Sequence, residues 1–91
     1  MRIEWTSKAL GDLARLYEFL ALVNQSAAAR LIQNLIKAPS NLLNNLRIGE
    51  KLDEFLPREL RRILVGHYEI RYEIKGDIIY VLRIWHTREE W

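Results

Sequence analysis

The apolar residues of this chain change their spacing once, and that change constrains the fold more than any other feature. Up to residue 46 they recur every three or four positions, which is the spacing of one buried face of an α-helix. From Arg61 onward they alternate with polar residues or form short continuous runs, which is typical of β-strands. Helices followed by strands predict an α+β domain in which the helices pack on an antiparallel sheet.

The first helix is predicted directly after a short strand. Residues 2–5 alternate polar and apolar side chains, and Thr6 or Ser7 can cap the helix that follows. The predicted buried face is the apolar stripe Leu10, Leu13, Ala14, Tyr17, Leu20 and Ala21. The solvent-facing side is predicted to carry the charged residues Lys8, Asp12, Arg15 and Glu18.

A second helix is predicted to start near Ser26 and to pack against the first. Its apolar stripe consists of Ala28, Leu31, Ile32, Leu35 and Ile36. Pro39 lacks the backbone N–H that a helix interior needs, which predicts a kink or a restart there. Because the connection at residues 24–26 is short, we expect the two helices to form an antiparallel hairpin.

Three strands are predicted after the irregular stretch 49–58. The first covers residues 62–65 and ends at Gly66, and the second covers residues 67–74. The second strand is predicted to place a charged face outward, made of His67, Glu69, Arg71 and Glu73. Gly76-Asp77 predicts a two-residue hairpin turn, and residues 78–86, apolar on both faces, predict a central last strand. The predicted order is β-α-α-β-β-β, a single domain over residues 1–91 with a helix hairpin on a mostly antiparallel sheet.

Composition excludes several classes of protein. The chain has no cysteine, and its two histidines lie far apart in sequence, so no metal site is expected. No motif implies a cofactor. No apolar run is long enough for a membrane span and no signal peptide is recognisable, which predicts a cytoplasmic protein. The net charge is only +2 without a basic block, which disfavours a DNA-binding protein driven by charge alone.

The carboxyl-terminal half carries a resemblance to a known family. Residues 58–72 contain a Leu-Arg pair, a Val-Gly step and a Tyr-x-Ile-x-Tyr strand, and residues 81–89 form a last strand with a His-x-Arg ending. This pattern resembles the RelE/ParE toxin superfamily, and Trp5-Thr6 followed by Asp12-Leu13 agrees with it. The resemblance covers nearly the whole chain and implies the toxin of a type II toxin–antitoxin pair, bound and blocked by an antitoxin encoded beside it.

One branch of that superfamily, the RelE-like toxins, cuts messenger RNA in the ribosome. Such cleavage needs cations at the scissile phosphate and a general acid or base. In this branch an arginine often follows the tyrosine of the third strand, whereas here Glu69 follows Tyr68. The resemblance therefore leaves an incomplete catalytic set, whose candidates are Arg62, Glu69, His86 and Arg88.

The other branch, the ParE-like toxins, inhibits DNA gyrase by trapping cleaved DNA, and the Val-Gly-x-Tyr and Trp-His-x-Arg segments are closer to it. Binding of this kind relies on aromatic and arginine anchors. The candidates for such anchors are Arg83, Trp85, His86, Arg88 and Trp91. Structural roles are also open, since Trp85 could be a core residue and Arg62 could pair with Glu59 or Glu69. A third possibility is that the chain only binds and buffers a partner.

Overall fold

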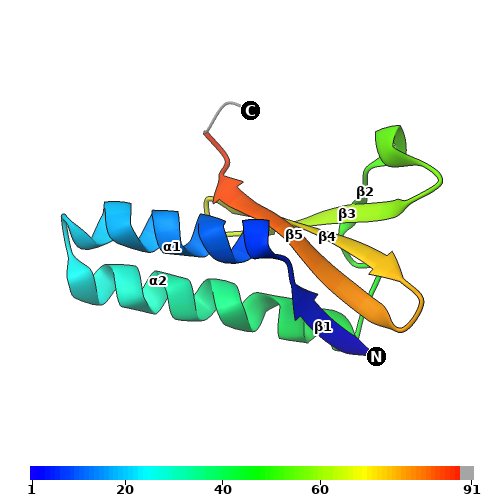
Figure 1. The fold of residues 1–91 in the computed structure, drawn as a ribbon, viewed down its shortest axis with the longest axis horizontal. Helices are drawn as coiled ribbons and strands as arrows, with labels where there is room; N and C mark the ends of the chain where they lie inside the picture. The colour runs from blue at the N-terminus through cyan, green and yellow to red at the C-terminus, as the bar shows by residue number, and fades with distance from the viewer. Residues whose placement is uncertain (89–91) are drawn as a thin grey trace.

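Two α-helices and a five-stranded sheet form the framework of the computed structural model, which describes residues 1–88 (Figure 1). The helices are α1 (Ser7–Ala21) and α2 (Gln25–Lys37), and the short 3₁₀ helices are η1 (Ala38–Leu43) and η2 (Asp53–Phe55). The strands are β1 (Arg2–Trp5), β2 (Glu50–Lys51), β3 (Glu59–Val65), β4 (Tyr68–Lys75) and β5 (Ile78–His86). The predicted α+β class and element order are confirmed, apart from the two-residue β2, which the sequence pattern missed.

The strand order in the sheet is β1-β5-β4-β3-β2. Strands β2 to β5 run antiparallel to their neighbours, and β1 runs parallel to β5. Two-residue turns join β3 to β4 and β4 to β5, and each contains a glycine with positive φ, Gly66 at 60° and Gly76 at 59°. Such tight hairpin turns need left-handed backbone, which glycine adopts without strain. Strand β1 pairs with β5, the last strand, and the chain between them forms both helices and the antiparallel strands β2 to β4. A long connection of this kind lets two parallel strands lie side by side.

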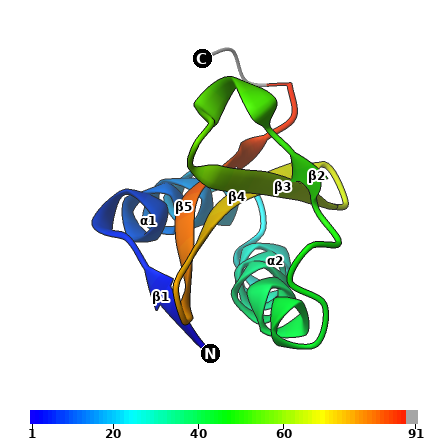
Figure 2. The ribbon, with the colours of Figure 1, turned by 90° about the vertical axis from the view of Figure 1, so that its right-hand side faces the viewer.

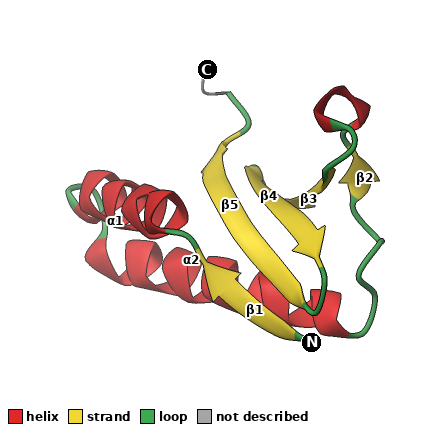
Figure 3. Cartoon of the chain, turned by 45° about the vertical axis from the view of Figure 1, so that its right-hand side comes forward, coloured by secondary structure: helices red, strands yellow, loops and turns green. Residues whose placement is uncertain are grey.

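Helices α1 and α2 cover one face of the sheet, and η2 lies on the other side of it (Figures 2 and 3). The core between helices and sheet is built from buried side chains of both layers, including Ala9, Leu13, Leu16, Leu35, Ile70, Val81 and Ile84. We call the face of the sheet away from α1 and α2 the open face. No helix within residues 1–88 is long and apolar enough to cross a membrane.

The helix boundaries follow the sequence signals closely. The Thr6 side chain accepts a hydrogen bond from the Ala9 N–H and caps α1, and Asn24 caps α2 through the Ala27 N–H. Pro39 stands at the point where α2 gives way to η1, so the predicted restart is confirmed.

The predicted buried face of α1 is only partly right: Leu13 is buried and Tyr17, Leu20 and Ala21 are half-buried, but two predicted members are exposed. Leu10 is 53% exposed and Ala14 is exposed, whereas Ala9 and Leu16 are buried. Ala9, Asp12, Leu13 and Leu16 form a second stripe with helical spacing, and this stripe faces the sheet. Asp12 is only 5% exposed, although the sequence pattern placed it toward solvent. Because Asp12 is charged, the stripe that contains it looks less apolar in the sequence than the predicted stripe that starts at Leu10.

The predicted solvated face of β4 is also wrong. Glu69 and Glu73 are 5% and 8% exposed, and Arg71 is half-buried. Alternation on β4 does separate apolar from charged residues, as expected. Guanidinium groups and η2, however, cover the charged side, so both faces of this central strand are buried.

Candidate functional site

The residues singled out from the sequence lie on two different faces of the sheet. Glu69 pairs with Trp85 across β4 and β5, and Tyr68 pairs with His86. Because successive residues of a strand point to opposite faces, Glu69 and Trp85 lie on the open face while His86 lies on the helix side. In the strand register, Arg62 of β3 and Arg83 of β5 lie opposite Arg71 of β4, so both belong to the open face as well. Trp91, the last candidate anchor, lies outside the described residues.

Glu69 is fully engaged by two arginines. Its Oε1 accepts a hydrogen bond from Arg62 Nη1 at 3.1 Å, and its Oε2 accepts one from Arg71 Nε at 2.8 Å. Arg62 also donates to Glu50 Oε2 at 3.0 Å, so the expected pairing of Arg62 with Glu69 forms together with a second pair. A general base needs a carboxylate oxygen that can reach a substrate proton. In this arrangement the Glu69 oxygens are instead used to hold arginine side chains.

His86 holds the start of the carboxyl-terminal tail. Its Nδ1 accepts a hydrogen bond from the Arg88 backbone N–H at 3.1 Å. The ring packs edge-on against Tyr68, with 5.2 Å between ring centroids, and stacks on His67 at 6.0 Å. His86 and Arg88 line a cavity of about 560 Å³ with residues of α1, among them Arg15 and Phe19. The structure therefore brings His86 and Arg88 together, and it separates both from Glu69.

Arg83 and Trp85 lie side by side on the open face, in a stack that also contains Arg71. The Arg71 guanidinium carbon lies 4.7 Å from the centroid of the Trp85 ring, and that of Arg83 lies 5.7 Å from it. Phe55 of η2 lies on Arg71 as well, at 5.9 Å. Trp85 is only 8% exposed, so it packs as a buried residue and at the same time presents arginines on its ring. Arg71 was predicted to be a simple surface charge, and its place in this stack was not foreseen.

Asp12 fixes Arg83 from the neighbouring helix. Its two carboxylate oxygens accept hydrogen bonds from Arg83 Nε and Nη2 at 2.9 and 3.2 Å, and Oδ2 also accepts the Ile84 N–H at 2.9 Å. Strand β1 pairs with β5 only as far as Val81, so the edge of β5 beyond Val81 has no neighbouring strand within the described residues. Asp12 therefore has two roles: it accepts a hydrogen bond from the Ile84 N–H at the edge of β5, and it positions the Arg83 side chain. The signal that could have revealed it is a lone acidic residue within an otherwise apolar helical stripe.

Arg58, which precedes β3, makes the third ion pair of the open face, in which Glu73 is buried and the arginine is exposed. It donates to both Glu73 oxygens, with distances of 3.0 and 2.8 Å. This hydrogen bond and the nearby positive charge lower the pKa of Glu73 below its usual value. The same pair raises the pKa of Arg58, which stays protonated at any physiological pH.

A cleft of about 670 Å³ opens among these groups. Its walls come from the start of α1, from η2 and from the open face of β3, β4 and β5, and they consist of Thr6, Ser7, Lys8, Phe55, Arg58, Leu60, Arg71, Leu82, Arg83 and Trp85. Four of these side chains are cationic and none is acidic. The acidic partners of the three arginines lie behind them.

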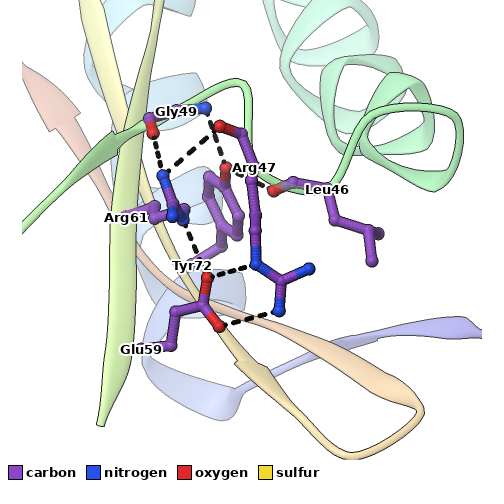
Figure 4. Close-up of polar contacts among 6 residues, drawn as sticks. All are labelled: Leu46, Arg47, Gly49, Glu59, Arg61 and Tyr72. Carbon is purple, nitrogen blue, oxygen red and sulfur yellow. Dashed lines mark hydrogen bonds and ion pairs between the residues drawn. The ribbon is translucent and has the colours of Figure 1, made fainter. Parts of the chain in front are cut away.

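A separate polar cluster lies on the helix side of the sheet and holds the segment between η1 and β2 (Figure 4). The buried Tyr72 hydroxyl accepts the Gly49 N–H at 3.1 Å and donates to the Leu46 carbonyl at 2.9 Å. Burial raises the pKa of Tyr72 above its usual value. Arg61 donates to the Gly49 carbonyl at 2.8 Å.

The same cluster contains Glu59, to which Arg47 donates at 2.8 and 3.0 Å (Figure 4). These bonds lower the pKa of Glu59. Every buried side-chain polar atom of the described chain has a partner, so this cluster is a satisfied structural network. Across residues 1–88, no three His, Asp or Glu side chains gather closely enough to hold a metal ion.

Comparison with known proteins agrees with this architecture. A sequence-family model of the ParE toxin of the type II toxin–antitoxin system parDE matches residues 3–91. A curated relative, Toxin RelE2 of Caulobacter vibrioides, is 29% identical over 86 residues, which cover 94% of each chain. A solved structure of the chromosomal ParDE toxin–antitoxin system from P. aeruginosa superimposes with a TM-score of 0.77 at 24% identity, covering 94% of this chain and 95% of that one. Since the family model spans almost the entire sequence, the chain belongs to the ParE toxin family of type II toxin–antitoxin systems, within the RelE/ParE superfamily.

Proposed function

We propose that this toxin acts in the cytoplasm as one domain over residues 1–91 and stops growth by inhibiting DNA gyrase. Its action is binding rather than RNA cleavage, and a cognate antitoxin encoded nearby neutralises it. The membership in a type II family implies the antitoxin, whereas the choice of gyrase is the step proposed here. No cofactor takes part in the proposed action.

The observation that carries the proposal is the arrangement of Arg83 and Trp85. Both were candidate anchors, and they lie together on the open face in a fixed geometry, with Asp12 holding the arginine. Arginine is enriched among the residues that dominate the binding energy of protein interfaces. Here the largely buried Trp85 ring supports the Arg83 guanidinium that a partner would contact. A preorganised pair of this kind suits binding to a large partner, because less side-chain entropy is lost on association.

The alternative is a RelE-like ribosome-dependent endoribonuclease that uses Arg62, Glu69, His86 and Arg88. The geometry supports it less well, because Glu69 and His86 point to opposite faces of the sheet and both Glu69 oxygens are occupied. One curated relative carries the name Toxin RelE2, so RNA cleavage is the outcome against which gyrase inhibition is tested.

The test is to express the toxin without its antitoxin and to follow DNA and protein synthesis separately by pulse labelling. We expect DNA synthesis to stop first, with double-strand breaks, and purified toxin to inhibit supercoiling by gyrase. An immediate collapse of protein synthesis with intact DNA would instead establish the ribosome as the target. Normal growth without the antitoxin would favour a chain that only buffers a partner.

Three variants test the roles of the candidate residues. Arg88 is exposed, and we expect Arg88→Ala to raise the toxin level needed for growth arrest at least tenfold if its side chain is an anchor, since a hot-spot loss of about 1.4 kcal/mol or more corresponds to that factor. The matched control is Arg30→Ala, which removes an exposed arginine from α2. Glu69→Gln should leave gyrase inhibition intact, whereas it would abolish a nuclease that depends on this carboxylate.

A further inference from the structure

Three arginines of the open face are held by carboxylates that are more buried than the arginines themselves. The relative side-chain exposures are 55% and 11% for Arg58 and Glu73, 28% and 7% for Arg71 and Glu69, and 29% and 6% for Arg83 and Asp12. An ion pair usually adds little net stability, because solvent screens an exposed pair and desolvation offsets the attraction in a buried one. Stability alone therefore does not account for three such pairs side by side. What they do provide is three guanidinium groups in fixed positions with one side accessible.

All three arginines line the 670 Å³ cleft of the open face, together with Lys8 at the start of α1. Two aromatic rings, Phe55 and Trp85, complete its walls. No acidic side chain lines the cleft, although a carboxylate pairs with each of the three arginines. These carboxylates are the more buried partners, so the guanidinium groups are what an anion in the cleft meets first. Guanidinium groups bind phosphate through paired N–H donors, and they also stack on flat rings.

This chemistry fits a nucleotide better than a simple anion. A nucleotide carries both a phosphate and a flat base, and proteins that hold single strands combine cationic grooves with aromatic or arginine stacking surfaces. The volume lies within the range of about 300–1,000 Å³ for small-molecule sites. A volume of this size is enough for one or two nucleotides of a single strand.

We propose that the open-face cleft binds a short single-stranded DNA segment, with phosphates against Arg58, Arg71, Arg83 and Lys8 and a base against Phe55. The choice of DNA over RNA rests on the proposed function, because gyrase is the target that holds cleaved DNA. The toxin then contacts the nucleic acid as well as the enzyme, and it adds cationic contacts to a DNA strand that the cleavage complex exposes.

The test measures binding of the purified toxin to a fluorescent oligothymidylate of about eight nucleotides by anisotropy, at several salt concentrations. Lys8→Gln and Arg58→Gln should each weaken binding several-fold. Each should also reduce the slope of log K against log salt by about 0.7, the value for one lost phosphate contact on a single strand. Lys8 is exposed and makes no ion pair with any residue of the described part of the chain, so its variant should fold normally even if Arg58→Gln does not.

Two matched controls lie away from the cleft. Arg47 pairs with Glu59 through two hydrogen bonds, as Arg58 does with Glu73, and its side chain is 57% exposed, but it lies on the helix side. Arg47→Gln should leave DNA binding unchanged, and so should Lys37→Gln at the end of α2. Amide shifts of the unmodified toxin, titrated with the same oligonucleotide, should cluster around Phe55, Arg71 and Trp85.

The proposal is overturned if the oligonucleotide does not bind at low salt, or if the controls lose as much affinity as the cleft variants. It is also overturned if an oligouridylate of equal length binds while the oligothymidylate does not, or if polyglutamate displaces the DNA at equal charge. Because these measurements contain no gyrase, they are independent of the supercoiling assay. A toxin that inhibits gyrase without binding DNA in the cleft would refute this inference and leave the proposed function standing.

Discussion

At the scale of single residues, Asp12 shows how one buried carboxylate connects the fold to the candidate site. It accepts hydrogen bonds from the Arg83 guanidinium and from the Ile84 N–H at the uncovered edge of β5. Removing the carboxylate would leave the Ile84 N–H without its acceptor and would take two hydrogen bonds from the Arg83 guanidinium. Both losses are costly, because a buried group without a partner keeps its full desolvation penalty.

Asp12→Ala should therefore lower the free energy of unfolding by about 2–4 kcal/mol, somewhat less than the loss of a fully buried pair because Arg83 is partly exposed. Glu18→Ala, which removes an exposed carboxylate from the same helix, should change it by no more than about 0.5 kcal/mol. Urea unfolding followed by circular dichroism measures both. Equal stability of the two variants would mean that the Asp12 contacts contribute nothing.

At the scale of elements, the segment between η1 and β2 is tied to β4 by Tyr72 and Gly49. A Cβ atom at Gly49 would lie 2.5 Å from the Tyr72 hydroxyl and 2.7 Å from the Arg62 carbonyl oxygen. Real side chains do not approach backbone so closely, so a larger residue must displace either the segment or β3. Glycine at this position is required for close approach and not for a special backbone angle.

The same substitution at two glycines should consequently have opposite effects. Gly49→Ala should destabilise the fold by about 1–3 kcal/mol, the usual cost of overpacking. Gly11→Ala should stabilise it by about 0.5–1 kcal/mol, because Gly11 lies inside α1 and no atom lies within 4 Å of the added Cβ. Melting temperatures of the two variants and of the parent chain test both effects. A stable Gly49→Ala variant would contradict the tight contact with Tyr72.

At the scale of the whole molecule, ion pairs hold both sides of the sheet. Glu73 with Arg58 lies on the open face, and Glu59 with Arg47 lies on the helix side. In the folded state both glutamates have a lowered pKa, caused first by hydrogen bonds from their arginines. Tyr72, in contrast, has a raised pKa, caused first by burial. The charged form of the glutamates and the neutral form of the tyrosine are therefore the ones that folding favours.

The pH dependence of the free energy of unfolding should follow from the directions of these pKa shifts. The contribution of Glu59 and Glu73 is present above the ordinary glutamate pKa of 4.5, and it is lost as the pH falls through their lower folded-state values. The contribution of neutral Tyr72 is present below 10 and is lost as the pH rises through its higher folded-state pKa. Melting temperatures measured across this range should form a plateau with both ends declining. The assignment of the acid decline to these two glutamates would be refuted by a double Glu59→Gln and Glu73→Gln variant whose melting temperature falls as steeply in acid as that of the parent.

The sequence by itself determined the elements and their order, because the signals for them are local. Caps at Thr6 and Asn24, the break at Pro39 and the turn glycines each act on their own neighbours. Several functional candidates were also accessible from sequence, and Arg83 and Trp85 do lie together.

Only the tertiary structure decided which charged residues are buried and which faces they share. Asp12, Glu69 and Glu73 looked like surface residues, because alternation and helical spacing say nothing about the groups that oppose a side chain. Glu69 finds Arg62 and Arg71 through the register of β3 and β4, and Asp12 finds Arg83 because β1 stops at Trp5 and leaves room for α1 beside β5. The separation of Glu69 from His86 follows from the pairing of β4 with β5. Each of these contacts joins segments distant in sequence, and only the folded chain brings such segments together.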